Sequence, residues 1–432
     1  MSNIKNIQTS FESFSGNVLS TDWKPLRGEA FNRFMENGFP TVKDEEWKYT
    51  NLAPISNGAF RPVNKSSIDA KSITPYLIAG EDVHLMVFVN GFLDHELSKT
   101  GSLPGGVIVG SLSEHHVHPA VKEHLGKIAT MQNGTLVDLN TAFIFEGAFL
   151  HVSKGVKLDR PVHFLFINDS PDAPALVSPR NLFVAEESSN VQIIESFHTN
   201  GSASSAFTNA VTEVLTEQYA ILDLTKVQLE NRNSYHVGYT AAKQQRHSEF
   251  HITTMTLDGA IVRNNLNILL AEEQCTSYLY GLYLLDGNQL VDNHSLVDHA
   301  VPNCQSNELY KGIIDGKAQG VFNGKIFVRK DAQKTNAYQS NKNILLSEEA
   351  SMNTKPQLEI FADDVKCSHG TTTGQLDEEA LFYLRSRGIG EDHARAFLNI
   401  AFAADVIQKV AYEPLRNHLM EMMEKKLRRE EF

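Results

Sequence analysis

Cys367 and His369 are the two side chains in this sequence whose types and spacing best suit metal binding. They lie in the segment Asp363–Gly370, which begins with two aspartates. Alternate side chains of an extended strand point to the same face, so this spacing predicts a thiol beside an imidazole. Thiolates hold most iron and iron–sulfur centres, and imidazole replaces a thiolate in some of them.

Two ligands do not complete the usual set of four around such a centre. A partner must then supply the remaining ligands, or the metal must be held transiently, as in a scaffold that passes a cluster on. The alternative is structural, because a buried cysteine beside a hydrogen-bonded histidine at a sheet edge has the same sequence. The residues alone leave both interpretations open.

Other histidines and cysteines form weaker candidates. The cluster His115, His116 and His118 precedes a proline, which is typical of solvated loop histidines as well as of a metal site. His294 and His299 lie among aspartates and asparagine, a pattern that polar turns stacked on a repetitive fold also produce.

The remaining cysteines, Cys275 and Cys304, lie far apart from each other and from Cys367, and no two cysteines form a CxxC motif. We expect both to be buried residues of the core. A sparse and odd set of cysteines fits a reducing compartment and argues against a disulfide scaffold.

Motifs for nucleotide and hydrolase chemistry are missing. The Gly-Lys pairs at 126–127, 316–317 and 324–325 are followed by Ile, Ala and Ile, so none completes a phosphate-binding GxxxxGK[ST] loop. The sequence also lacks GxGxxG, GxSxG and HExxH. We therefore expect a chain that is not an enzyme and has no ATPase activity of its own.

Composition excludes further classes of protein. The formal net charge is −13 over 432 residues, which argues against binding to a nucleic-acid backbone. No run of about eighteen apolar residues predicts a membrane span. The first residues contain no apolar signal region, so the expected location is cytoplasmic.

Short strands dominate the region from Val83 to Val365. Between Asn307 and Gly374, for example, brief apolar runs alternate with Asp-Gly, Asn-Gly, Asn-Lys-Asn and Lys-Pro, which are typical of turns. Without long helices between the strands, a doubly wound α/β fold is excluded. An antiparallel sandwich or barrel and a parallel β-helix remain, and the strand pattern continues for much longer than a single sandwich, which favours the solenoid.

The chain divides into three segments on these patterns. Residues 1–80 form an N-terminal helical or mixed region, residues 81–370 the β-helix core, and residues 371–432 a C-terminal helical domain. In the last segment Asp377 is expected to cap one helix, and further helices begin near Glu391 and Pro414. Such a tail would cap the open end of a solenoid, which otherwise exposes unpaired strand edges.

Two aromatic residues, Trp47 and Tyr49, stand out in the N-terminal segment. We expect them to anchor this segment to the main body. A platform for stacking a base or a flavin is the alternative, but no phosphate-binding loop lies nearby to support it.

The long motifs Asp292–His299, Asn307–Gly374 and Phe382–Ile389 resemble the SufB/SufD family of the SUF machinery, which assembles iron–sulfur clusters. The N-terminal motif Glu45–Leu52 is similar to the SufD branch of that family. The resemblance covers most of the chain and is strongest from about Asp292 to Val406. It implies a mainly β protein built on a right-handed parallel β-helix, which decides between the two architectures above.

The resemblance also implies partners and a site. It implies a SufB-like subunit that meets the segment containing Cys367 and His369, and a SufC-like ATPase that docks on the C-terminal helices. His369 is then implicated in a transient iron–sulfur cluster or iron shared with SufB, while the role of Cys367 is less defined. A homodimer of the isolated chain and flavin binding by the assembled complex stay open, since no residue here supports either.

Two other functions compete with this one. A purely structural adaptor would hold the same partners without touching metal, and would differ only at His369. A β-helical carbohydrate lyase or hydrolase would need paired acid and base carboxylates and usually works outside the cytoplasm, which the missing signal region disfavours.

Overall fold

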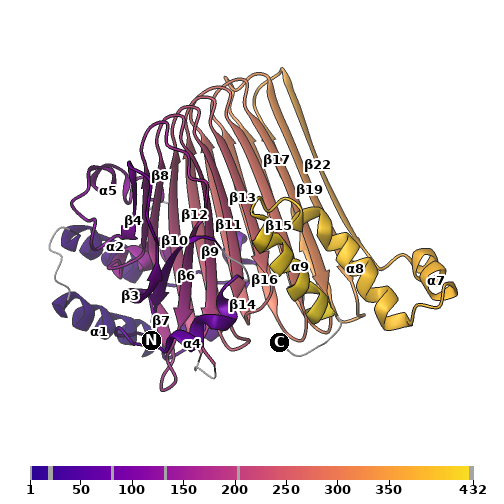
Figure 1. Cartoon of the computed structure of the whole chain (residues 1–432), viewed down its shortest axis with the longest axis horizontal. Coiled ribbons are helices and arrows are strands. Elements are labelled where there is room, and N and C mark those ends of the chain that lie inside the picture. The colour runs from indigo at the N-terminus through magenta and orange to yellow at the C-terminus, as the bar shows by residue number, and fades with distance from the viewer. Residues whose placement is uncertain (1, 18–22, 79–81, 131–133, 202–204, 428–432) are drawn as a thin grey trace.

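The structure is a computed structural model that describes residues 2–17, 23–78, 82–130, 134–201 and 205–427. Its centre is a flattened coil of parallel strands, with helices at the N-terminal end and a second group of helices against one side near the C-terminal end (Figure 1). Through most of the coil, successive strands alternate between two sheets, so each turn there adds one strand to each sheet. The prediction of a parallel β-helix is confirmed.

The first sheet contains the strands β1 (Arg61–Pro62), β4 (Val107–Ser111), β5 (Ala148–Val152), β7 (Ala175–Val177), β8 (Arg180–Ala185), β10 (Ala206–Thr216), β12 (Tyr235–Gln244), β14 (Ile261–Leu270), β16 (Leu290–His299), β18 (Gln319–Val328), β20 (Ser351–Thr354) and β21 (Gln357–Ile360).

The second sheet contains β2 (His84–Val89), β3 (Phe92–Lys99), β6 (Val162–Asn168), β9 (Asn190–Thr199), β11 (Ile221–Leu229), β13 (Glu249–Thr256), β15 (Thr276–Leu285), β17 (Gln305–Ile314), β19 (Thr335–Leu345) and β22 (Val365–Gly374). Only the pairs β2–β3 and β4–β5, at the start of the coil, are antiparallel among the described strands.

The length of chain in each turn varies along the coil. Tyr235 pairs with Ile261, whereas Gln305 pairs with Asn336, which lies further along the chain from its partner. The variation arises in the turns, because each long strand pairs in register with the next. It explains why the sequence shows no strict repeat although the fold is repetitive.

The interior of the coil is mostly apolar. Near the N-terminal end it contains stacked phenylalanine rings, such as Phe164 on Phe183 with centroids 5.2 Å apart and Phe166 on Phe197 at 4.9 Å. Polar side chains also enter it, and some form buried ion pairs. Glu195 and Lys226, on neighbouring turns, lie 3.0 Å apart with both side chains buried, which compensates part of the cost of removing each charge from water.

Helices cover the N-terminal part. The elements are α1 (Ser2–Asn17), α2 (Lys24–Asn37), α3 (Ala53–Ser56), α4 (Ala70–Ile73), α5 (Pro119–His124) and α6 (Thr135–Ala142), with 3-10 turns at Glu45–Trp47 and Thr74–Tyr76. Phe31 and Phe34 of α2 share a buried cluster with Leu139 of α6 and with Phe207 of β10. The strand pattern did not predict α5 and α6, which are short insertions near the start of the coil.

Three helices form the C-terminal segment: α7 (Glu378–Ser386), α8 (Glu391–Ile407) and α9 (Glu413–Leu427). The side chain of Asp377 accepts hydrogen bonds from the backbone of Glu379 and Ala380, as its predicted capping role requires. The predicted starts of α8 and α9 are confirmed as well. In Figure 1, α8 and α9 lie against the sheet near β15 and β17, while α7 stands apart from it.

The helices α8 and α9 bury one face against the second sheet, on the side of the coil near β15 and β17, so the prediction that this tail caps the open end is wrong. Val406, Ile407 and Leu419 belong to the same buried cluster as Leu282 and Ile313 of the strands. The strands of the coil extend from His84 to Gly374, and the division into segments 1–80, 81–370 and 371–432 stays a prediction. No helix of the described ranges has the length and apolar character needed to cross a membrane.

Candidate functional site

The terminal turn of the coil places Cys367 and His369 side by side. Both lie on β22, which pairs in parallel with β19 so that Cys367 stands beside Ala337 and His369 beside Gln339. Ala337 and Gln339 are buried and face the interior of the coil. Because paired residues of parallel strands point to the same face, Cys367 and His369 also face the interior. The prediction that they share one face is confirmed.

The coil ends at β22, so no further strand of this chain covers these two side chains, and they differ in exposure. Cys367 is half-buried against Ala332, Ala337 and Val328, whereas His369 is exposed. Burial raises the pKa of the Cys367 thiol, so the thiol stays protonated unless a metal displaces its proton. Of the two candidate residues, His369 is thus the more accessible, and Cys367 is the more structural.

The end of the coil is an open edge in both sheets. The strand β22 ends the order of one sheet, and β20 and β21 pair only with β18 at the end of the other, among the strands that the structure describes. The interruption predicted at Lys355-Pro356 separates β20 from β21. Figure 1 shows β22 as the outermost strand at this end of the coil.

Residues that would be buried in an earlier turn are uncovered at this edge. Leu358 and Ile360 stand beside Ile326 and Val328, which are buried inside the coil. Ile360 itself is 37% exposed, and Phe361 next to it is 60% exposed. An apolar surface next to unpaired strand edges favours a partner that continues both sheets.

The ligand set at this edge is incomplete. Across the described ranges, no three His, Cys, Asp or Glu side chains gather in a way that could hold a metal ion. Cys367 and His369 supply one thiol and one imidazole, so an iron or cluster centre here needs ligands from another chain.

His294 and His299 do not form a joint site. The ring of His294 lies between two carboxylates, with Nδ1 3.2 Å from Glu46 and Nε2 3.0 Å from Asp292. His299 is buried, its Nε2 lies 2.9 Å from Ser306 Oγ, and burial lowers its pKa to about 4. The neutral, buried imidazole of His299 therefore contributes to the packing of the core.

The residue Asp292 joins His294 to the N-terminal segment. Its Oδ2 accepts hydrogen bonds from Thr50 and Arg263, each at 2.5 Å. Burial alone would raise the pKa of Asp292, but the Arg263 guanidinium and His294 hold it well below its usual range. The network is therefore a charged anchor between the segment and the coil.

Trp47 completes that anchor. The Arg263 guanidinium lies over its ring, 4.1 Å from the centroid, as in a cation–π contact. This supports the anchoring interpretation for Trp47. Tyr49 is 39% exposed and contacts Lys48 instead, so it takes a smaller part than the sequence suggested.

The cluster at His115–His118 is divided among local contacts. His116 Nδ1 lies 2.8 Å from the Ser113 carbonyl, and His118 begins α5 by accepting a hydrogen bond from the Ala120 backbone. The His115 ring lies against Phe149, and burial lowers its pKa. These histidines are loop and capping residues.

Cys275 and Cys304 are fully buried on neighbouring turns, as predicted. Their thiols lie 3.0 and 3.3 Å from the same acceptor, the carbonyl of Glu272. They are core residues near a corner of the coil.

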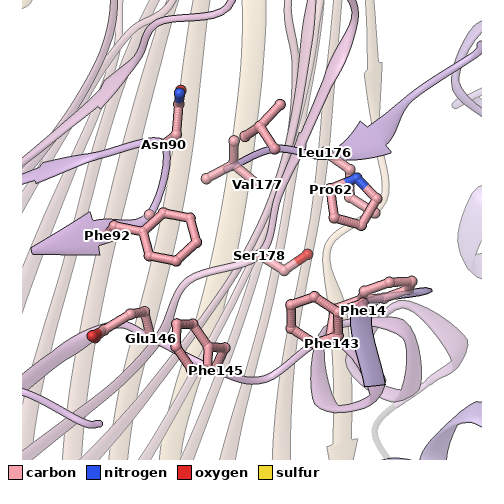
Figure 2. A pocket seen from close by; sticks show the side chains of 12 residues that line it. Phe14, Pro62, Asn90, Phe92, Phe143, Phe145, Glu146, Leu176, Val177 and Ser178 are labelled. Carbon is pink, nitrogen blue, oxygen red and sulfur yellow. The ribbon is translucent and has the colours of Figure 1, made fainter. Parts of the chain in front are cut away.

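The cavity between the N-terminal region and the first turns does not offer a competing site. Figure 2 shows it surrounded by the rings of Phe14, Phe92, Phe143 and Phe145. Its volume is about 40 Å³, which is too small for a substrate. Glu146 lines it, and burial raises the pKa of this carboxyl, which accepts a hydrogen bond from Ser113.

Sequence reasoning missed two buried residues behind His369. Glu308 on β17 stands beside Gln339 on β19, which in turn stands beside His369. Alternation within Gln305–Ile314 suggests that Ser306, Glu308 and Tyr310 share a face, but only the register between strands reveals that this face is internal.

Comparisons with known proteins agree with the fold. Residues 166–402 match the family model described as "SUF system FeS cluster assembly, SufBD core domain", and residues 8–164 match the SufBD protein N-terminal region.

Individual relatives extend along nearly the whole chain. An iron-sulfur cluster assembly SufBD family protein of Synechocystis is 34% identical, over 88% of this chain and 86% of its own length. The iron-sulfur cluster assembly protein SufD of Escherichia coli is 29% identical, over 93% and 92%, and the SufD of Bacillus subtilis is 26% identical, over 98% of each chain. With its core and N-terminal regions both matched, this chain belongs to the SufBD family of iron–sulfur cluster assembly proteins.

Proposed function

We propose that this chain is a SufD-like scaffold subunit that pairs with a SufB-type subunit through its open edge and contributes His369 to a nascent cluster or its iron. The observation that carries the proposal is the position of Cys367 and His369, side by side on the last strand of an uncovered coil. A partner strand laid beside β22 would bring its own side chains next to theirs.

The open edge supports pairing of this kind. Leu358, Ile360 and Cys367 occupy interior positions that only a further turn can cover. Backbone groups along an unpaired strand also need partners, and a second coil continuing both sheets would provide them. The SufB-type chain would then complete the ligand set that this chain leaves unfinished.

The C-terminal helices support docking of a SufC-type ATPase. α8 and α9 bury one face on the coil. Three aromatic residues remain exposed on these C-terminal helices: Phe382, at 74%, and Tyr383 on α7, and Phe397 on α8. Exposed aromatic residues on helices form the usual anchors of a protein interface. The partner would supply the nucleotide chemistry for which this sequence has no motif.

The test is anaerobic cluster reconstitution on the purified complex of this chain with SufB-type and SufC-type partners. For His369→Ala, we expect folding and complex formation to be retained while cluster yield falls at least tenfold. Cys367→Ala should have the smaller effect, because its thiol packs against Ala337 and Val328.

Ser368→Ala is the matched control, since this residue lies between the two candidates and its side chain points to the opposite face of β22. Normal cluster yield in the intact His369→Ala complex would reject the metal role. The chain would then be a structural adaptor.

A further inference from the structure

We propose that Glu308 and Gln339 position the imidazole of His369, with the Gln339 side-chain oxygen accepting the N–H of one ring nitrogen so that the other faces the metal. The inference rests on the proposed function, because it names the residues that would orient its ligand. Its basis is a column of three side chains on three successive turns.

The register defines the column. Glu308 pairs with Gln339, and Gln339 pairs with His369, so the three side chains follow one another along the interior face of the second sheet. Glu308 and Gln339 are buried, at 2% and 3% exposure. The column therefore leads from the enclosed interior to the open edge.

Hydrogen bonds fix the inner part of the column. Ser295 Oγ donates to one oxygen of Glu308 at 2.6 Å, and the amide nitrogen of Gln339 donates to the other at 2.8 Å. Above its pKa of about 7 the Glu308 carboxylate only accepts hydrogen bonds, so it then requires the nitrogen of the Gln339 amide, and not the oxygen, to face it. The amide oxygen must then point elsewhere.

That oxygen lacks a partner. Within the described ranges, no hydrogen-bond donor reaches Gln339 Oε1, although the side chain is almost completely buried. An unsatisfied buried acceptor costs about 1–3 kcal/mol, which makes it unusual in a folded protein. The next residue of the column is His369, whose ring carries the N–H donor that would satisfy it.

Space for the Gln339 amide comes from Gly324. A Cβ atom at Gly324 would lie 2.2 Å from the Gln339 nitrogen, so any other residue would displace the amide. Gly324 lies within β18, beside Ser295, the same residue that donates to Glu308. Glycine inside a strand weakens it, so close approach of another group is a sufficient reason for its presence.

Orientation of this kind matters for a metal ligand. Imidazole binds metal through a nitrogen that carries no proton, and a hydrogen bond at the other nitrogen selects the tautomer and the ring angle. Loss of such a partner typically lowers metal affinity by about 10–100-fold. Because His369 is exposed on an open edge, few other contacts hold its ring in place.

Two measurements test the inference. The first is ¹⁵N NMR of the histidine rings in the full chain, with the His369 signals assigned by their loss in His369→Ala. We expect a single tautomer in the wild type and a mixture of tautomers in Gln339→Met, which keeps the side-chain length and removes the acceptor. The second is cluster yield in the complex, where Gln339→Met should cause a loss of at least tenfold.

Further variants separate positioning from general damage. Glu308→Gln can still accept the Gln339 N–H through its amide oxygen while its amide nitrogen donates to Ser295 Oγ, so it should behave nearly as the wild type. Glu308→Met and Gly324→Ala should instead give a mixture of His369 tautomers. The matched control is Gln244→Met, a buried amide of an earlier turn that bonds to Ser248 and Thr276. Gln244→Met should destabilise the fold without changing the tautomer of His369.

The outcomes distinguish this inference from the proposed function. If Gln339→Met leaves both the tautomer and the cluster yield unchanged, the positioning role is overturned while the metal role of His369 can stand. If the His369→Ala complex assembles clusters normally but Gln339→Met gives a mixture of His369 tautomers, the hydrogen bond is confirmed and the metal role of His369 fails.

Discussion

The Lys311 ammonium lies 2.5 Å from the Asp405 carboxylate and 2.8 Å from the Phe402 carbonyl, which joins strand β17 to helix α8. The Phe402 ring centroid lies 4.3 Å from the same nitrogen. The Lys311 side chain is 4% exposed, so its charge is satisfied almost entirely by the helix. Helix α8 is thus firmly attached to the outer face of the second sheet.

We therefore predict that Lys311→Met loosens the C-terminal helices. The substitution removes the hydrogen bonds of the ammonium to the Asp405 carboxylate and to the Phe402 carbonyl, and we expect a loss of about 1–3 kcal/mol in the free energy of unfolding. Denaturant unfolding measures the loss, and hydrogen exchange should locate it in α8 and α9. Asp405→Asn should cost less, because that carboxylate is 63% exposed; equal losses would contradict the assignment.

The proposed docking of a SufC-type ATPase is best tested on the surface of α7. Deleting the tail after Thr373 would uncover Leu282 and Ile313, which the helices bury, so a truncated chain would lose more than a docking site. We predict that Phe382→Ala combined with Tyr383→Ala weakens binding about 10–100-fold while the fold is kept.

Isothermal titration against the SufC-type partner measures that affinity. Glu421→Ala, an exposed change on α9, is the control. Unchanged affinity of the double variant would remove this aromatic surface from the interface.

The open edge should be sensitive to charge. Ile360 occupies an interior position of the coil, so pairing with a SufB-type chain would bury it. We predict that Ile360→Lys weakens the heterodimer at least tenfold, since a buried unpaired charge is costly.

Analytical ultracentrifugation or surface plasmon resonance reports the change. Thr372→Lys adds the same charge to the outward face of β22 and should have little effect. Equal affinities for the wild type and Ile360→Lys would place the interface elsewhere. Loss of self-association without loss of heterodimer would instead indicate that this edge forms a homodimer.

The buried carboxyl of Glu308 should make stability depend on pH. Burial raises its pKa to about 7, opposed in part by hydrogen bonds from Ser295 and Gln339. The ordinary value in an unfolded chain is about 4.3, so the folded protein binds this proton more tightly. The stability that results is fully present below about pH 4 and is lost as the pH rises through 7.

Glu308→Gln cannot titrate, so it removes this dependence. Between pH 4 and pH 8, the free energy of unfolding of the wild type should fall relative to that of the variant by about 3 kcal/mol. Thermal unfolding across this range measures the difference. An exposed carboxyl, Glu349, provides the control substitution Glu349→Gln, and a constant difference between wild type and Glu308→Gln would refute the prediction.

Local patterns in the sequence predicted a chain dominated by short strands and identified the candidate ligands, while the family resemblance decided for the parallel β-helix. Short apolar runs between turn residues predict strands, and Asp377 predicts the start of α7, because both signals depend on neighbours within a few residues. The spacing of Cys367 and His369 places them on one face of any extended strand. Local rules of this kind hold whatever the rest of the chain does.

Only the tertiary structure decided which face of each strand is internal and which residues meet across turns. Glu308, Gln339 and His369 lie on three successive turns, and the interval between stacked strands changes along the coil, so no fixed period could align them. The contact of Trp47 with Arg263 likewise joins segments that are far apart in the sequence. Such relationships arise from packing of the whole chain, which selects one register among many that the local sequence allows.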